Sequence, residues 1–342
     1  MERQQSSKKI SVPRSLVLIA LASVFAIGVF LGRSTWLFGP APEDRGEPAS
    51  APLSEEFRFI RQSLQPDLQD ARKVRELKPF RYKVSALIDE ARADEVASFV
   101  AVYFRDLDNG NWFGINDQEP FSPEGQLKIP LMIAYFKWAE SNPLVLRKKL
   151  PVTKHTSGGE PVFLRPPREL EPGRSYSVND LIFRMIAYGD NAAYDVLAAH
   201  LPPKHRNRIY TDLYVNYDPL KKEDLLSLSA YASFFRVLFN ASYLSEEMSE
   251  KALRYLSRSS FRGGIAAGVP PDIDVAIKAG ERVIEQTGDT EQLQLHEFGI
   301  IYHPGRPFLL GVTARGTDFD DLSRLIKDIT KLIYTEVDHQ SQ

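Results

Sequence analysis

The sequence contains no cysteine, which excludes disulfide bonds, thiolate metal sites, a cysteine nucleophile and a lipid-modified cysteine anchor. It also lacks an excess of either charge, because 43 lysines and arginines nearly balance 45 aspartates and glutamates. No strongly basic surface is therefore expected, and nucleic acid is not a predicted partner. The six histidines show no metal-site spacing and stand near no G-x-S-x-G motif. We predict no metal, no organic cofactor and no α/β-hydrolase triad.

What the chain does contain is enough apolar material for a substantial core. Its 342 residues are 43% hydrophobic and 11% aromatic, which suffices for a large domain and leaves room for an extension outside it. We find no internal repeat. The sequence therefore predicts one main globular domain with an N-terminal extension.

One long apolar run stands near the N-terminus. Residues 15–31 carry no charge, a length near the lower limit for a helix that crosses a hydrocarbon core. Trp36 and Phe38 follow the run and are typical of an interfacial anchor. We therefore expect a single transmembrane helix with its anchor over 15–38. A cleaved signal peptide, which shares a basic start and an apolar stretch, is the alternative.

The charges around this run predict its orientation. The tail at 1–14 is basic, whereas acidic residues appear soon after the run. By the positive-inside rule, the tail is cytoplasmic and the globular domain is extracytoplasmic.

Two segments separate the apolar run from the main domain. Residues 39–52 are rich in proline, glycine and acidic residues, a composition that predicts a linker because it cannot bury enough apolar surface to fold. Within 53–80, apolar residues from Phe57 to Leu64 recur at helical spacing and predict a short stalk helix. The main domain is then expected over 81–338.

Strands are predicted at both ends of this domain and helices in its middle. The turn at 108–111 separates two β-rich runs and predicts a hairpin. The predicted strands are 97–105, 112–115, 275–278, 297–302 and 308–314, and the predicted helices are 127–140, 178–187, 192–200, 225–239 and 319–337. This order predicts an α/β fold, an α-β-α sandwich whose mainly antiparallel sheet joins both ends of the domain, with an inserted all-α subdomain.

Three short segments carry polar residues suited to chemistry, although each has an ordinary structural explanation when taken alone. Lys128 opens an apolar helix, and a lysine there is usually solvated. Asp190 and Asn191 stand between two helical stretches, where they would cap a helix. Lys278 lies at the end of a predicted strand.

Taken in order and in context, these segments resemble a known family. Residues 121–137 resemble the segment around the S-x-x-K motif of class A β-lactamases and related penicillin-binding enzymes. Residues 176–193 resemble the helix that leads into S-D-N, residues 275–281 the strand that bears K-T-G, and residues 296–308 the next strand and its hairpin. The resemblance to the serine β-lactamase and penicillin-binding superfamily extends over about 81–337.

The resemblance implies which residues stand at the catalytic positions. In that family a serine at a helix start attacks the substrate, and a lysine one helical turn later activates it. Here the serine position is Gly125, while Lys128 remains as a base. Gly189 stands at the proton-relay position and Ala279 at the hydroxyl position of the third motif. Three hydroxyl groups that the family uses are therefore absent.

The resemblance also implies which binding groups remain. Asn191 keeps the amide that holds a substrate amide, and Lys278 with Ala279 and Gly280 keeps the strand that attracts a substrate carboxylate. Backbone N–H groups of Gly125 and Glu281 would form the oxyanion hole.

These substitutions predict a catalytically inactive, membrane-anchored relative that binds a cell-wall-type peptide, a β-lactam-like ligand or a protein partner. An active hydrolase with a different nucleophile, or with a water molecule activated by Lys128, is the alternative. Ser122 precedes Pro123 and is expected in a loop, so it is a poor substitute nucleophile. The stretch 205–223 lacks the deacylation motif E-x-x-L-N of class A enzymes, and Glu223 is better explained as a helix start.

A purely structural role is the third hypothesis. It requires that large side chains fill the cleft, and the side chains suited to this are Phe163, Tyr176 and Arg282.

Overall fold

The computed structural model describes residues 57–61, 78–121, 124–152, 163–215, 226–287 and 290–341. All of them belong to one compact unit, Ser50–Gln342. The predicted cytoplasmic tail, transmembrane helix and linker lie outside the described residues. Within the described ranges, no helix is long and apolar enough to cross a membrane.

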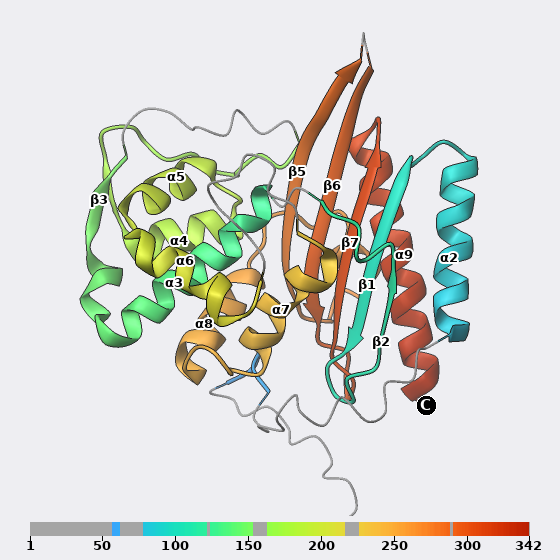
Figure 1. Ribbon diagram of the computed structural model, residues 1–342, viewed down its shortest axis with the longest axis horizontal. Coiled ribbons are helices and arrows are strands. Elements are labelled where there is room, and N and C mark those ends of the chain that lie inside the picture. The colour runs from blue at the N-terminus through green and yellow to red at the C-terminus, as the bar shows by residue number, and fades with distance from the viewer. Residues whose placement is uncertain are drawn as a thin grey trace, which may run out of the picture. The chain divides into compact units, whose positions relative to one another are not determined.

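A five-stranded antiparallel sheet with the order β2-β1-β7-β6-β5 forms the centre of the domain (Figure 1). Its strands are β1 (Phe99–Asp106), β2 (Trp112–Ile115), β5 (Val275–Thr287), β6 (Thr290–Ile301) and β7 (Phe308–Gly316). Since β1 pairs along its whole length with β7, the two ends of the domain meet in one sheet, as the sequence predicts. The predicted hairpin of β1 and β2 is also confirmed.

Helices cover both faces of this sheet. On one face lie α2 (Lys78–Ala93) and α9 (Phe319–Ser341), and Figure 1 shows the two side by side. Between β2 and β5 the chain forms the helices that cover the other face: α3 (Lys128–Ser141), α4 (Val178–Ala187), α5 (Asn191–His200), α6 (Pro203–Asp212), α7 (Leu228–Phe239) and α8 (Glu246–Leu256). The arrangement confirms an α/β fold with an antiparallel sheet and helices.

The alternation of side chains along the strands produces two separate cores. On β1, Ala101 and Tyr103 pack with the helices between β2 and β5, whereas Val100, Val102 and Phe104 pack with α2 and α9. Successive residues of a strand point to opposite faces, so an apolar strand supplies both cores at once.

Several short elements complete the domain. The strands β3 (Lys149–Pro151) and β4 (Ser175–Ser177) pair with each other, and three short 3-10 helices are η2 (Glu124–Leu127), η3 (Pro143–Arg147) and η4 (Ile265–Gly268). Ser177, Ser227 and Ser245 cap α4, α7 and α8, each accepting a backbone N–H from three residues later.

Helices α6 and α8 were not predicted, and β5 and β6 are longer than predicted. In α6 only Ile209 and Tyr210 are buried, so its apolar periodicity is weak. The outer part of the β5–β6 hairpin extends beyond β7, whose last residue pairs with Leu293. The sequence of that part is mainly polar, so it lacks the apolar alternation that predicts a strand.

Residues 57–61 bend and do not form the predicted stalk helix. They lie against the domain instead, with the side chains of Phe59 and Ile60 buried. Both residues donate their backbone N–H groups to Oε2 of Glu250, at 2.7 and 3.2 Å. Residues 62–77, the middle of the predicted stalk region, lie outside the described residues, and α2 begins at Lys78.

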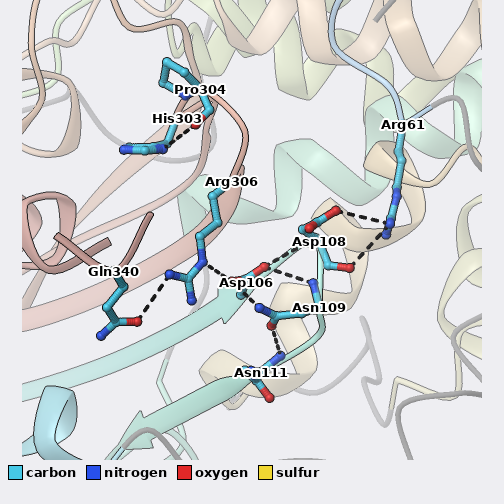
Figure 2. Close-up of polar contacts among 9 residues, drawn as sticks. All are labelled: Arg61, Asp106, Asp108, Asn109, Asn111, His303, Pro304, Arg306 and Gln340. Atoms are coloured by element: carbon cyan, nitrogen blue, oxygen red, sulfur yellow. Dashed lines mark hydrogen bonds and ion pairs between the residues drawn. The ribbon is translucent and has the colours of Figure 1, made fainter. Parts of the chain in front are cut away.

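Arg61 joins the segment 57–61 to the turn between β1 and β2 (Figure 2). Arg61 donates to the carbonyl of Leu107 at 2.9 Å and pairs with Asp108. The same turn is held by the buried carboxylate of Asp106, which accepts the backbone N–H of Asp108 at 2.9 Å and Nε of Arg306 at 2.6 Å. Three segments distant in the sequence are therefore joined at this end of the sheet.

These contacts predict that Glu250 stabilises the domain. Replacing it by alanine (Glu250→Ala) leaves two N–H groups without their acceptor, so we expect a loss of about 2–3 kcal/mol in the free energy of unfolding. Urea denaturation of the domain checks this value. The control is Glu246→Ala, which removes an exposed carboxylate from the same helix and is expected to cost under about 1 kcal/mol. Equal losses in the two variants would contradict the prediction.

Candidate functional site

The first predicted site segment lies where η2 meets α3. Lys128 is the first residue of α3, and its side chain is buried. Its Nζ donates to the carbonyl oxygen of Gly189 and to Oδ1 of Asn191, both at 2.7 Å. Without a functional role, Lys128 was expected to be solvated at the start of a helix. Its amine is instead bonded to two residues of the second segment.

The second segment is the turn between α4 and α5. Gly189 has a φ of +72°, in the left-handed region that glycine adopts without steric cost. The next residue, Asp190, caps α5 by accepting the N–H of Ala193 at 3.0 Å, which confirms its predicted structural role. Burial raises the pKa of Asp190, and hydrogen bonds from the first turn of α5 oppose the rise. Asn191 then begins α5 with its amide oxygen on Lys128.

The third segment lies on β5, the edge strand of the sheet, with Lys278, Ala279 and Gly280 all buried. Gly125 packs directly on this strand, since a methyl group placed on its Cα would lie 3.1 Å from Cα of Gly280. A methyl group on Gly189 would lie 3.8 Å from Nζ of Lys278. The structure therefore brings all three predicted segments together.

Two lysine amines, those of Lys128 and Lys278, interact electrostatically at the site. Burial lowers the pKa of Lys278 well below its ordinary value, and the neighbouring charge of Lys128 lowers it further. The carboxylates of Glu297 and Glu281 oppose that effect. Nζ of Lys278 donates to the carbonyl of Ala279 at 2.6 Å.

Comparison with known proteins agrees with this geometry. The model of the β-lactamase enzyme family matches residues 80–337. The chain belongs to this family. No curated protein matches the chain.

Several solved structures share the fold at low sequence identity. PBP-A is 18% identical with a TM-score of 0.63, covering 78% of this chain and 98% of its own. A β-lactamase from Sphaerobacter thermophilus is 21% identical with a TM-score of 0.62, covering 74% and 96%. A β-lactamase from Chitinophaga pinensis is 19% identical with a TM-score of 0.64, covering 76% and 99%. These similarities establish the fold alone.

This β-lactamase family member has amines, an amide and backbone N–H groups in its site, but glycine or alanine at the three positions where hydroxyl groups were expected. Ser122 and Glu223, the two other residues considered for chemistry, lie outside the described residues. No group of three or more metal-ligating side chains occurs in the described part of the chain. The groups present are suited to holding an anionic or amide-containing ligand.

Of the three large side chains considered as cleft fillers, two pack elsewhere. The ring of Phe163 stacks on Phe319 of α9, with their centroids 5.3 Å apart. Tyr176 belongs to the core of the helical part, and its hydroxyl accepts the N–H of Glu171 at 3.0 Å. Arg282 is half-buried on β5.

Glu281 has a second contact that the sequence does not reveal. Its backbone N–H is the predicted oxyanion donor, while its side-chain Oε2 accepts the N–H groups of Phe163 and Leu164 at 2.9 and 2.7 Å. The residues joined are more than a hundred positions apart, so no local pattern indicates the contact.

Sequence reasoning also missed Glu297, a fully buried glutamate on β6 opposite Ala279. Its Oε2 accepts the N–H of Ile265 at 2.6 Å. Burial raises the pKa of Glu297 to about 7, against the opposing effects of that hydrogen bond, Lys278 and Arg262. The available signal was a glutamate at the start of the predicted strand 297–302, which contains no other charged residue.

The raised pKa predicts a pH-dependent stability. In the unfolded chain this carboxyl ionises near 4.5, whereas in the folded chain it keeps its proton to about pH 7. Stability from this group is therefore complete below pH 4.5 and is lost as pH rises to about 7, by about 3 kcal/mol in all. We expect Glu297→Gln to remove this loss when urea unfolding is measured at pH 5 and pH 8. An unchanged difference between the two pH values would contradict the prediction.

Proposed function

We propose that this protein is a membrane-anchored, exported β-lactamase-like domain that binds its ligand without cleaving it. The ligand is a peptidoglycan-type peptide, a β-lactam-like molecule or a protein partner. The observation that carries the proposal is the absence of hydroxyl groups at Gly125, Gly189 and Ala279, in a site whose amines and amide remain.

The loss of the nucleophile alone is enough to stop turnover. Removing the attacking residue from a cooperative catalytic group costs on the order of a million-fold in rate. Gly125 has no side chain, and Lys128 directs its amine at the carbonyl of Gly189 and the amide of Asn191. The proton relay is missing as well, because Gly189 also has no side chain.

The binding groups are less affected by these substitutions. Backbone N–H groups form an oxyanion hole without any side chain, so glycine at position 125 keeps that donor. The amine of Lys278 is buried on β5, where it can donate hydrogen bonds to an anionic ligand. Asn191 supplies an amide beside Lys128. This combination supports retention of binding after the loss of cleavage.

The anchor and the extracytoplasmic location rest on the N-terminal sequence. An uncharged run at 15–31 follows a basic tail, which favours a single membrane-spanning helix with the domain exported.

The first test is acylation by a β-lactam, followed by intact-mass measurement. We expect no adduct on the native protein and weak labelling by a fluorescent penicillin when Gly125→Ser and Gly189→Ser are combined. Labelling stays weak because Cα of Gly280 must move slightly to admit a side chain at position 125, and a non-glycine residue in the left-handed conformation costs roughly 1–2 kcal/mol.

A stoichiometric adduct on the native protein would overturn the proposal. It would favour the second function, a hydrolase with a non-standard nucleophile or a water activated by Lys128. The observation in favour of that function is the amine of Lys128, which remains buried at the site and is positioned by Gly189 and Asn191. Hydrolysis of a chromogenic cephalosporin that Lys128→Ala abolishes would establish it.

The second test separates binding from a purely structural role. Replacing the buried amine (Lys278→Met) should weaken binding of a fluorescent penicillin at least tenfold in fluorescence anisotropy, because the carboxylate loses a hydrogen-bond donor. The matched control is Lys251→Met, whose ammonium lies over the rings of Phe136 and Tyr255 on the helical side. Equal affinities in the two variants would favour the structural role.

A further inference from the structure

A segment that we name the strap, residues 163–170, joins the two sides of the site. At its first end, the N–H groups of Phe163 and Leu164 both bond to Oε2 of Glu281. The ring of Phe163 packs against the rings of Phe261 and Phe319. This end is therefore fixed to the strand that carries Lys278, Ala279 and Gly280.

The other end of the strap is fixed to the opposite side of the site. The carbonyl of Arg168 accepts Nη1 of Arg184 at 3.4 Å, and Leu170 is buried in the core of the helical part. Arg184 belongs to the last turn of α4, and its own carbonyl accepts the N–H of Asp190 at 3.3 Å. The attachment point is thus bonded to the turn that contains Gly189 and Asn191.

The middle of the strap contains two prolines. Pro166 and Pro167 fix their φ angles and have no backbone N–H to donate, and the chain bends at Pro167 and Arg168. Arg165, Pro167 and Arg168 are exposed, which leaves few contacts to hold the segment between its two ends. Figure 1 shows this part of the chain running from the side of β5 to the helical part of the domain.

We propose that the strap is an autoinhibitory latch across the site, and that the Glu281 carboxylate is the positioning residue that keeps it closed. A ligand that reaches the backbone N–H of Glu281 lies close to the N–H groups of Phe163 and Leu164, which the Glu281 carboxylate binds. An extended peptide presents successive N–H groups of this kind, so it can displace the strap by taking over the carboxylate. The ligand that displaces the strap is inferred from the proposed binding function. The closure of the site by the strap does not depend on that function.

The absence of cysteine from the chain makes the closure measurable. In an Asn191→Cys background the protein has a single thiol, beside Lys128 inside the site. Its rate of reaction with a methanethiosulfonate reagent reports how often the site is open. We expect Glu281→Ala to raise that rate at least tenfold, and Glu281→Gln, which keeps an acceptor oxygen, to raise it less. The matched control is Glu171→Ala, an exposed carboxylate just beyond the strap, which should leave the rate unchanged.

A second variant releases the strap without altering β5. Phe163→Ala removes the ring contacts with Phe261 and Phe319, and it should also raise the thiol reaction rate. Hydrogen exchange gives an independent measure, since the amides of Phe163 and Leu164 should exchange faster in both variants. Rates unchanged from the parent in Glu281→Ala and Phe163→Ala, for the thiol or for the amides, would overturn the latch.

Binding of a fluorescent penicillin separates the latch from the proposed function. If the latch guards a working site, Glu281→Ala binds the penicillin at least fivefold more tightly than the parent. If the thiol becomes accessible but neither protein binds the penicillin or a D-Ala-D-Ala peptide, the latch stands and the binding function fails. Equal, measurable affinities in parent and variant would show that the strap does not guard the site and would overturn the inference.

Discussion

One ammonium group, that of Lys128, joins the parts of the site that belong to different helices. It stands at the first residue of α3 and donates to the carbonyl of Gly189 and the amide of Asn191. A buried cation costs several kcal/mol unless such partners satisfy it, so α3 and the α4–α5 turn are held in a defined relation. The packing of Gly125 on Gly280 depends on that relation, because η2 leads directly into α3.

The electrostatics of the site follow from placing a second lysine near the first. Burial and repulsion by Lys128 both disfavour the charge on Lys278. Glu297, on the neighbouring strand, partly compensates, but burial disfavours its charge too. Burying these charged groups is therefore costly to the folded state.

Two carboxylates tie distant segments to the domain by the same device. Glu250 accepts two successive N–H groups from residues 57–61, and Glu281 accepts two successive N–H groups from the strap. In each case a non-helical piece of chain is held by two successive backbone N–H groups, so its side chains are free to contact other surfaces. The first contact extends the folded unit beyond the predicted start at residue 81, and the second joins the two sides of the site.

The sequence by itself determined the class of fold and the order of the site segments. Apolar periodicity indicated most strands and helices, and the segments around Lys128, Asn191 and Lys278 stood in the order of a known family. Helix α6 was not predicted because a largely polar helix has little apolar periodicity. Only the tertiary structure decided the environment of Glu297 and the second contact of Glu281, since the partners of these side chains come from other segments of the chain. Burial and hydrogen bonding between distant segments leave no local pattern, and they determine the electrostatics of this site.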